Sequence, residues 1–216
     1  MMNVKFDDCI YLIKHKINYI DAIQVMYDRL DSYLNSSSCE RLFILEHNNV
    51  YTIGKGVDCN LNSLFDIPVI KANRGGLWTF HGVGQVVVYF VYDIKKRNFT
   101  ISYFLNKLEN FLINFFFRKY NIILCTNNKE AGGRGLWLQC GLLMKKVVFI
   151  GLQVKSGVVL HGLSINVCND MKFFDYITPC GVDSSLCTSF HKESLYFDIN
   201  NFKSDLSIAL YDEFFS

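Results

Sequence analysis

Apolar residues recur along the chain at two different spacings, and these spacings predict its helices and strands. From residue 20 to residue 34 they fall at three- and four-residue steps, which is typical of an amphipathic helix that Asp21 can cap. The same kind of pattern predicts helices at 99–120 and 199–214. Runs of β-branched and aromatic residues predict strands at 41–46, 50–53, 86–92, 122–125, 136–140, 146–154 and 157–166.

The order of these elements indicates the fold class. Strands come in runs, turns are expected between consecutive strands at 47–49 and 155–157, and helices do not alternate regularly with strands. We therefore expect an α+β fold in which mixed or antiparallel sheets carry flanking helices. At 216 residues the chain suits one domain, 1–216, and can bury a sizeable core.

Composition restricts the classes of partner. Half of the residues are apolar and 19% are charged, as in a globular protein, and a net charge of +2 is too small to indicate nucleic-acid binding. The most apolar region, 99–120, is interrupted by amide and charged side chains, so it does not predict a membrane span. Because no amino-terminal secretion pattern is present, we expect a cytoplasmic protein. Three basic runs are either solvated ends of elements or docking points for an acidic protein: 95–97, 118–119 and 145–146.

The eight cysteines predict neither disulfides nor a metal site. Outside an oxidising compartment thiols stay reduced. No C-x-x-C pair occurs, and the step from Cys180 to Cys187 is too wide for a zinc knuckle. Small buried hydrophobic roles are expected for Cys39, Cys125, Cys140 and Cys168.

Cys180 and Lys146 are the residues that most suggest chemistry. Cys180 lies between Pro179 and Gly181, and Lys146 opens an apolar strand that ends at Gly151. A thiol beside an ammonium group becomes a thiolate, which is the nucleophile of acyl transfer. Taken singly, each residue could equally have a purely structural role, Cys180 as a small buried thiol and Lys146 as a lysine at the edge of a strand. Only their proximity in the fold would make them a pair.

Two glycine-containing segments carry histidines. The loop 74–85 has glycines that let backbone approach a ligand closely, or simply form a tight turn before the next strand. It matches neither a phosphate loop nor a dinucleotide fingerprint. His47, His81 and His161 lie at strand ends, where a histidine is either structural or part of a pocket.

Together these segments resemble the lipoyl(octanoyl) transferases of lipoate biosynthesis. The resemblance covers about residues 40–190, the motif-bearing core, and follows the family's order in six segments: 45–54, 74–85, 135–137, 146–151, 161–167 and 179–181. It implies the fold of the biotin and lipoate protein ligases. It also implies transfer of an octanoyl group from octanoyl-acyl carrier protein to a specific lysine of a lipoyl domain, the first step of de novo protein lipoylation.

The resemblance also implies roles for residues. Cys180 would carry the acyl group as a thioester, and Lys146 would lower the pKa of that thiol. His47 and His161 would lie nearby. The acyl group would be bound by Arg74, Gly75, Gly76, Leu77, Trp78, Thr79, Phe80, His81, Phe149, Ile150, Gly151, Gly162, Leu163 and Ser164.

The chain departs from the family pattern at a few loop positions. Asn48, Asn49 and Val83 stand where prolines are usual, and Arg134 stands where threonine is frequent. These changes affect the rigidity of the loops and leave the reacting residues in place.

The resemblance implies no ATP, metal or other cofactor, because a thioester is already activated. The implied partners are octanoyl-acyl carrier protein, the lipoyl domains of 2-oxoacid dehydrogenase E2 subunits and the glycine cleavage H protein, with no nucleic acid or membrane. Three alternatives stay open at this point: an ATP-dependent lipoate–protein ligase, which would not need Cys180, a non-catalytic relative that binds acyl carrier or lipoyl domains, and a thioesterase.

Overall fold

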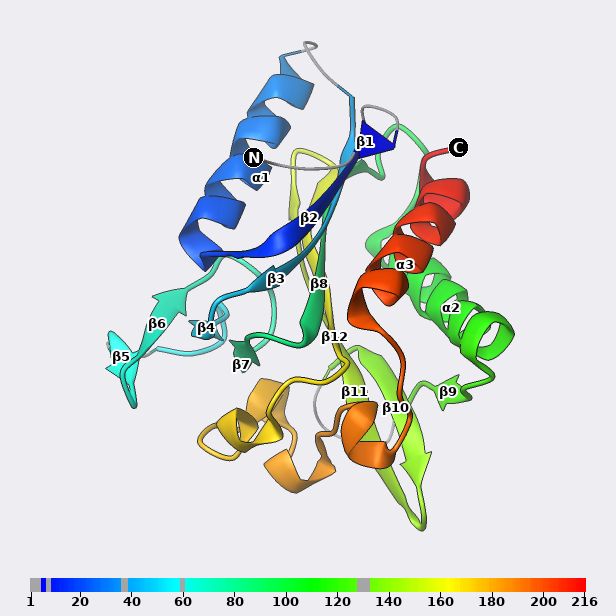
Figure 1. Cartoon of the computed structure of the whole chain (residues 1–216). Helices are drawn as coiled ribbons and strands as arrows, with labels where there is room; N and C mark the ends of the chain where they lie inside the picture. The colour runs from blue at the N-terminus through cyan, green and yellow to red at the C-terminus, as the bar shows by residue number, and fades with distance from the viewer. Residues whose placement is uncertain (1–4, 7–8, 36–38, 59–60, 128–132) are drawn as a thin grey trace.

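The computed structural model describes residues 5–6, 9–35, 39–58, 61–127 and 133–216 and shows two sheets with helices on both sides of the larger one (Figure 1). The larger sheet has the strand order β1-β2-β3-β8-β12-β11-β10-β9. Its strands are β1 (Lys5–Phe6), β2 (Ile10–Ile17), β3 (Arg41–His47), β8 (Gln85–Asp93), β9 (Leu124–Cys125), β10 (Gly135–Cys140), β11 (Leu143–Lys155) and β12 (Val158–Asn166).

The smaller sheet lies beside the larger one and has the order β5-β6-β4-β7. Its strands are β4 (Val50–Ile53), β5 (Ser63–Leu64), β6 (Ile67–Lys71) and β7 (Trp78–His81). Pairing is antiparallel except between β2 and β3 and between β4 and β6. Four short 3₁₀ helices follow β12, at Met171–Phe174, Pro179–Gly181, Ser184–Leu186 and His191–Glu193. The α+β prediction with mixed sheets is confirmed.

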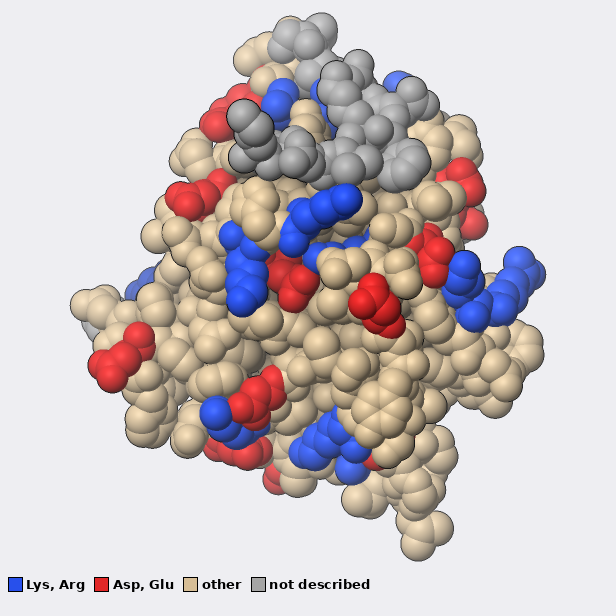
Figure 2. Space-filling model, viewed as in Figure 1, with Lys and Arg blue, Asp and Glu red and all other residues tan. Residues whose placement is uncertain are grey.

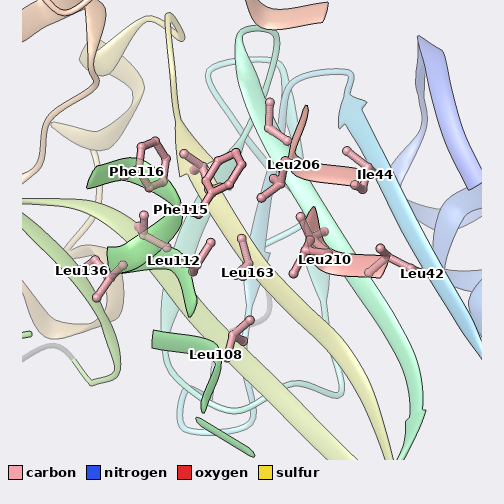
Figure 3. Close-up of a cluster of buried hydrophobic side chains, with 14 of the residues drawn as sticks. Leu42, Ile44, Leu108, Leu112, Phe115, Phe116, Leu136, Leu163, Leu206 and Leu210 are labelled. Atoms are coloured by element: carbon pink, nitrogen blue, oxygen red, sulfur yellow. The ribbon is translucent and has the colours of Figure 1, made fainter. Parts of the chain in front are cut away.

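Three helices cover the larger sheet in the described part of the chain: α1 (Tyr19–Leu34) on one face, α2 (Ile101–Tyr120) and α3 (Ile199–Phe214) on the other. Figure 3 shows the core under α2 and α3, where leucines of both helices meet β3, β10 and β12. Burial of these side chains stabilises the fold by about 25 cal/mol for each Å² of apolar surface removed from water. The central strands β8 and β12 are therefore covered on both faces, and nearly every residue of the two strands is buried.

Local hydrogen bonds decide where the helices begin. Thr100 caps α2 by accepting the N–H of Tyr103, so this helix starts slightly later than the apolar pattern predicts. Asp198 caps α3 in the same way. The predicted cap Asp21 is wrong: it lies inside the first turn of α1, where its carboxylate accepts a hydrogen bond from Asn18.

Several sequence predictions differ from the structure. The turn predicted at 47–49 is present as a bend at residues 48 and 49, but β3 and β4 on either side of it belong to different sheets. The turn at 155–157 is confirmed, with Ser156 and Gly157 both at positive φ as a tight hairpin requires. β2 was not predicted, since its second half, from Lys14 to Lys16, is polar and exposed. The expectation of buried thiols is wrong for Cys125 and Cys168, which are exposed, and for Cys39 and Cys140, which are partly exposed.

Charged groups are mixed on the surface. Figure 2 shows Lys and Arg interspersed with Asp and Glu on the face viewed there, in keeping with the small net charge. No helix of the described residues has the length and apolar character needed to cross a bilayer.

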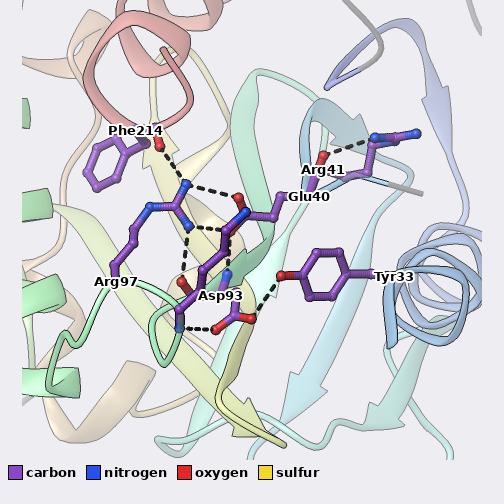
Figure 4. Close-up of polar contacts among 7 residues, drawn as sticks. Tyr33, Glu40, Arg41, Asp93, Arg97 and Phe214 are labelled. Atoms are coloured by element: carbon purple, nitrogen blue, oxygen red, sulfur yellow. Dashed lines mark hydrogen bonds and ion pairs between the residues drawn. The ribbon is translucent and has the colours of Figure 1, made fainter. Parts of the chain in front are cut away.

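A polar network fastens the end of β8 to three other elements (Figure 4). Arg97 donates to both carboxylate oxygens of Glu40, at 2.6 and 2.9 Å, and Glu40 also accepts the N–H of Asp93. The hydroxyl of Tyr33, in α1, donates to Asp93. Arg97 also donates to the carbonyl of Phe214 in α3. The network therefore ties both helical layers to one corner of the sheet.

Arg97→Ala is expected to lower the free energy of unfolding by about 2 kcal/mol, since hydrogen bonds to charged groups contribute roughly 1.5–3 kcal/mol and this pair is partly exposed. Urea denaturation followed by circular dichroism measures the change. Lys119→Ala, which breaks the more exposed pair with Asp205, is the control and should cost less than about 1 kcal/mol. Equal effects for the two variants would contradict the role given to this network.

Candidate active site

A β-bulge turns Lys146 out of the α2–α3 core. In the pairing of β10 with β11, Leu136 faces Val148 and the next residue, Trp137, faces Lys146, so Val147 is extra. Val147 and Val148 consequently both point into the core under α2 and α3. Lys146 and Phe149 point to the opposite face, toward the smaller sheet. Bulges of this kind commonly re-aim a side chain beside an active site.

The Lys146 side chain is buried among aromatic rings. Its residue is 0% exposed, and its Nζ lies 5.0 Å from the ring centre of Phe149 and 5.7 Å from that of Trp137. Nζ donates to the carbonyl of Gly133 at 3.2 Å. Burial lowers the pKa of Lys146, because the charged ammonium loses hydration. Such a lysine releases its proton more readily than one in water.

Gly135 leaves the room that Lys146 occupies. A Cβ on Gly135 would lie 2.7 Å from Cε of Lys146 and 2.1 Å from the Val148 carbonyl oxygen, and its φ of 145° favours glycine. The buried carboxylate of Glu109 accepts the Gly135 N–H at 3.2 Å and pairs with Arg134 at 2.7 Å. Burial raises the pKa of Glu109, while Arg134 opposes that shift.

Cys180 sits on a strained turn next to the glycine-rich loop. It adopts φ 53° and ψ 27°, a left-handed conformation that side chains other than glycine rarely take and that clusters at functional sites. The turn packs against β7. A Cβ placed on Gly76 would lie 3.8 Å from Cys180 Sγ, at van der Waals distance, so the two residues are neighbours, and the φ of 84° at Gly76 favours glycine.

The segment that carries Cys180 is fixed beside Lys146. Cys187 forms a parallel bridge with Lys146, and Thr188 donates its N–H to the Lys146 carbonyl at 3.0 Å. Cys180, Cys187 and Phe149 pack in one hydrophobic cluster. Negative charge on Cys180 favours the ammonium form of Lys146 and so opposes, without overcoming, the effect of burial on the Lys146 pKa. The fold thus brings the predicted thiol and amine into one electrostatic neighbourhood.

A pocket on the α1 face of the larger sheet opens at Cys180. The space counted together with its open mouth is about 400 Å³. Its lining crosses β11, β12 and β8 and is capped by β7 and the start of α1: Tyr19, Arg74, Thr79, His81, Val87, Tyr89, Phe149, Ile150, Gly151, His161, Gly162, Leu163, Ser164 and Cys180.

Some of the residues predicted to bind the acyl group lie elsewhere. Because side chains alternate along a strand, Thr79 and His81 of β7 face the pocket while Trp78 and Phe80 pack with the cluster around Phe149. Leu77 lies near Gly56 and Gly181, outside the pocket lining. His47 does not line the pocket but contacts two residues that do, Tyr19 and Tyr89.

Arg74 organises the loop that lies over the pocket. Its guanidinium donates to the backbone carbonyls of Thr52 and Gly75 and to the Thr52 hydroxyl, at 2.7–3.0 Å. Gly75 in turn donates its N–H to Leu152 of β11 at 2.9 Å. A Cβ on Gly54 would lie 2.2 Å from the Gly76 carbonyl oxygen, so this loop also requires glycine at its partner position.

Hydrogen bonds determine the tautomers of two histidines. His47 donates from Nδ1 to the Ile17 carbonyl, so its Nε2 accepts from the Tyr89 hydroxyl. His81 bonds from Nδ1 to Gln85 at 2.7 Å, and the Gln85 amide nitrogen is occupied with two oxygens. His81 therefore donates to the Gln85 oxygen, and its Nε2 is left as an acceptor.

All three histidines near the pocket are neutral in the native state. Burial lowers the pKa of His47 and of His161 to about 4, and it lowers the pKa of His81 well below its usual range. Arg74 further disfavours charge on His81 and His161. Among the residues that the structure describes, no group of three His, Cys, Asp or Glu side chains could hold a metal ion.

The fold and this site point to a family of acyl-handling domains. The family model of the lipoyl protein ligase A/B catalytic domain matches residues 18–210. The chain belongs to this family.

Curated relatives agree with the family assignment. The chain is 36% identical over 183 residues to the octanoyltransferase of Orientia tsutsugamushi (strain Boryong), which covers 83% of this chain and 86% of the relative. It is 32% identical over 200 residues to the octanoyltransferase of Rickettsia bellii (strain OSU 85-389), covering 89% and 92%. The resemblance seen in the sequence motifs is thus confirmed.

Solved structures share the fold at low identity. A crystal structure of lipoate-protein ligase A bound with ATP matches with a TM-score of 0.71 at 12% identity, covering 94% of this chain and 84% of the other. A bipartite lipoate protein ligase from Thermoplasma acidophilum, described with its E2 lipoyl domain, matches with a TM-score of 0.65 at 13% identity, covering 97% and 84%. These likenesses confirm the ligase-type fold.

Sequence reasoning missed Glu109 beside Lys146 and three residues of the pocket lining, Tyr19, Val87 and Tyr89. Glu109 carries a signal that could have revealed it, because a lone carboxylate sits on the apolar face of α2. Tyr19 carries none, since only the packing of α1 places it over the pocket.

Acidification is expected to destabilise the protein through His47. Its folded pKa of about 4 lies below the unfolded value of 6.5, so the stability it contributes is complete above pH 6.5 and is lost as the pH falls toward 4. At about 1.4 kcal/mol per pKa unit, wild type should lose about 3 kcal/mol more than His47→Gln between these pH values. Urea titrations across this range measure the difference. His15→Gln, at an exposed position, is the control, and a wild-type loss no larger than that of His47→Gln would refute the assignment.

Proposed function

We propose that this protein is an octanoyltransferase of protein lipoylation, which moves an octanoyl group from a carrier thioester to a lysine of a lipoyl domain through a thioester on Cys180. One observation carries the proposal: Cys180 lines a pocket with apolar side chains and shares an electrostatic neighbourhood with the buried Lys146. The octanoyltransferases among its relatives support the same reaction.

In the first half-reaction Lys146 and Cys180 share one proton, as ammonium and thiolate. The thiolate attacks the carbonyl carbon of the octanoyl thioester and forms a tetrahedral intermediate. As the bond to the carrier sulfur breaks, the Lys146 ammonium gives its proton to the departing thiolate. Lys146 is then neutral, which is the form that its burial favours.

In the second half-reaction the neutral Lys146 accepts a proton from the incoming lysine amine. That amine has an ordinary pKa of about 10.4 and is not nucleophilic until it is deprotonated. The amine attacks the thioester on Cys180, its second surplus proton passes to bulk water as the amide forms, and Cys180 leaves as a thiolate beside the regenerated ammonium. One lysine thus serves both half-reactions in opposite protonation states. The proposed reaction needs no ATP, metal or other cofactor.

The pocket and loops supply binding and transition-state stabilisation. Apolar side chains such as Phe149, Ile150 and Val87 line the pocket, and each buried methylene contributes about 0.8 kcal/mol. Backbone N–H groups of the glycine-rich segments beside Cys180 are proposed to stabilise the oxyanion, at about 3 kcal/mol per donor.

The proposed partners follow from the reaction. Octanoyl-acyl carrier protein is the donor. The acceptors are lipoyl domains of 2-oxoacid dehydrogenase E2 subunits and the glycine cleavage H protein. A structural neighbour described with its E2 lipoyl domain supports this class of acceptor. We propose that the reaction takes place in the cytoplasm.

Incubation with octanoyl-acyl carrier protein, without ATP, should add one octanoyl mass to the protein, and peptide mapping should locate it on Cys180. Cys180→Ser should abolish the adduct and the transfer to a lipoyl domain, whereas Cys125→Ser, at an exposed thiol away from the pocket, should retain both. A persistent adduct in Cys180→Ser would place the nucleophile elsewhere. A strict requirement for ATP would favour a ligase, and release of free octanoate despite an added lipoyl domain would favour a thioesterase.

Removing the charge of Lys146 should move the reactivity of Cys180 to higher pH. Lys146→Met keeps most of the side-chain volume but cannot stabilise a thiolate. The rate of alkylation of Cys180 by iodoacetamide, followed by peptide mass, should therefore rise at a pH at least one unit higher than in wild type. Lys145→Met, whose amine pairs with Glu193, is the control. Superimposable wild-type and Lys146→Met profiles would disprove the electrostatic role.

A further inference from the structure

The acyl pocket has two ends made by different parts of the fold. Cys180 lies at one end, next to Gly76, where the glycine-rich loop flanks the free edge of β11 through the bond from Gly75 to Leu152. The lining then passes over β12 to β8, and neighbouring strands lie about 4.8 Å apart, so β8 is about 10 Å from β11.

Tyr19 forms the far end. It is the first residue of α1, and its ring lies 5.3 Å from that of His47 on β3, the strand beyond β8. It also stacks on His81 at 6.1 Å with nearly parallel planes. Figure 1 shows the amino end of α1 next to the smaller sheet, where β7 carries His81 and Thr79. An acyl chain bound on Cys180 and laid across the strands therefore runs toward Tyr19.

The far end is polar, although the substrate chain is apolar. The Tyr19 hydroxyl and the Thr79 hydroxyl are buried, with each residue 4% exposed, and neither makes a hydrogen bond to the described residues. Both ring nitrogens of His161, which also lines the pocket, are buried and make no hydrogen bond to the described residues. His81 adds an acceptor, because its Nδ1 is committed to Gln85. Buried polar atoms without partners are costly, and a methyl group cannot supply one.

We propose that Tyr19, His81 and Thr79 form a hydrogen-bonding subsite at the far end of the acyl pocket, which takes a medium-chain acyl group with a terminal hydroxyl. This inference rests on the proposed function, since it takes the pocket to hold a chain bound at Cys180. The terminal hydroxyl accepts from Tyr19 and donates to His81. A chain of equal length that ends in methyl leaves both groups unpaired and binds more weakly, whereas octanoyl is one atom shorter and stops before them.

A binding comparison tests the subsite without requiring transfer. The probes are 8-hydroxyoctanoate and nonanoate, which have equally long chains and differ only in the terminal hydroxyl or methyl. Each acid is titrated for protection of Cys180 against iodoacetamide, because Cys180 lines the same pocket. Wild type should bind 8-hydroxyoctanoate at least as tightly as nonanoate, whereas an apolar pocket would favour nonanoate.

Tyr19→Phe removes only the unpaired hydroxyl and should shift the ratio of the two affinities by about tenfold toward nonanoate, equal to about 1.4 kcal/mol. Thr79→Val should shift it in the same direction. Tyr33→Phe lies on the same helix, but its hydroxyl bonds Asp93 outside the pocket, so it should keep the wild-type ratio. A wild-type preference for nonanoate, or a ratio unchanged in both pocket variants, would overturn the subsite.

The same thioesters on acyl carrier protein separate this inference from the proposed function. Adducts on Cys180 with an unchanged hydroxyacyl preference in Tyr19→Phe would remove only the subsite. Absence of any adduct, together with a tenfold shift in acid affinity, would remove only the transferase and leave the subsite in place.

Discussion

The burial of one lysine is the constraint on which the site depends. An ammonium group is costly to remove from water, so Lys146 needs a carbonyl partner, aromatic faces and nearby negative charge to remain inside the protein. The bulge at Val147 supplies this position without opening the α2–α3 core, because both neighbouring valines stay buried. Gly135 and Glu109 complete it by leaving room for the lysine stem and by anchoring the adjoining strand.

The rest of the structure brings a thiol and a pocket to that lysine. The segment after β12 is clipped to β11 through Cys187 and Thr188, and a left-handed residue at its turn presents Cys180. Strand β7 of the smaller sheet covers the pocket with Thr79 and His81. Arg74 holds the glycine-rich loop before β7 in place through its bonds to Thr52. The pocket itself joins two hydrophobic clusters, one around Phe149 and one under α1. Lys146, Cys180 and the pocket therefore meet on one side of the larger sheet, the side away from α2 and α3.

Sequence patterns predicted much of this arrangement, for identifiable reasons. The helices and the central strands follow from periodicity because they bury apolar stripes or faces, and α1, α2 and α3 begin within two residues of the expected positions. β2 was missed because its outer half faces solvent and it pairs in parallel with β3, a partner about thirty residues away. The turn at 47–49 was predicted, but the change from one sheet to the other at this turn was not, because no local signal encodes it.

By itself the sequence determined which residues could react: a thiol, a lysine and glycine-rich loops are chemical facts of the chain, and their order matched a family. Only the tertiary structure decided what these groups face. Whether Thr79 or Phe80 lines the pocket depends on the pleat of β7, and whether Lys146 turns toward Cys180 depends on one extra residue in β11. Tyr19 enters the site only because α1 packs across the sheet. Side-chain direction, burial and long-range pairing are set by packing among distant segments, and these carry no mark in the local sequence.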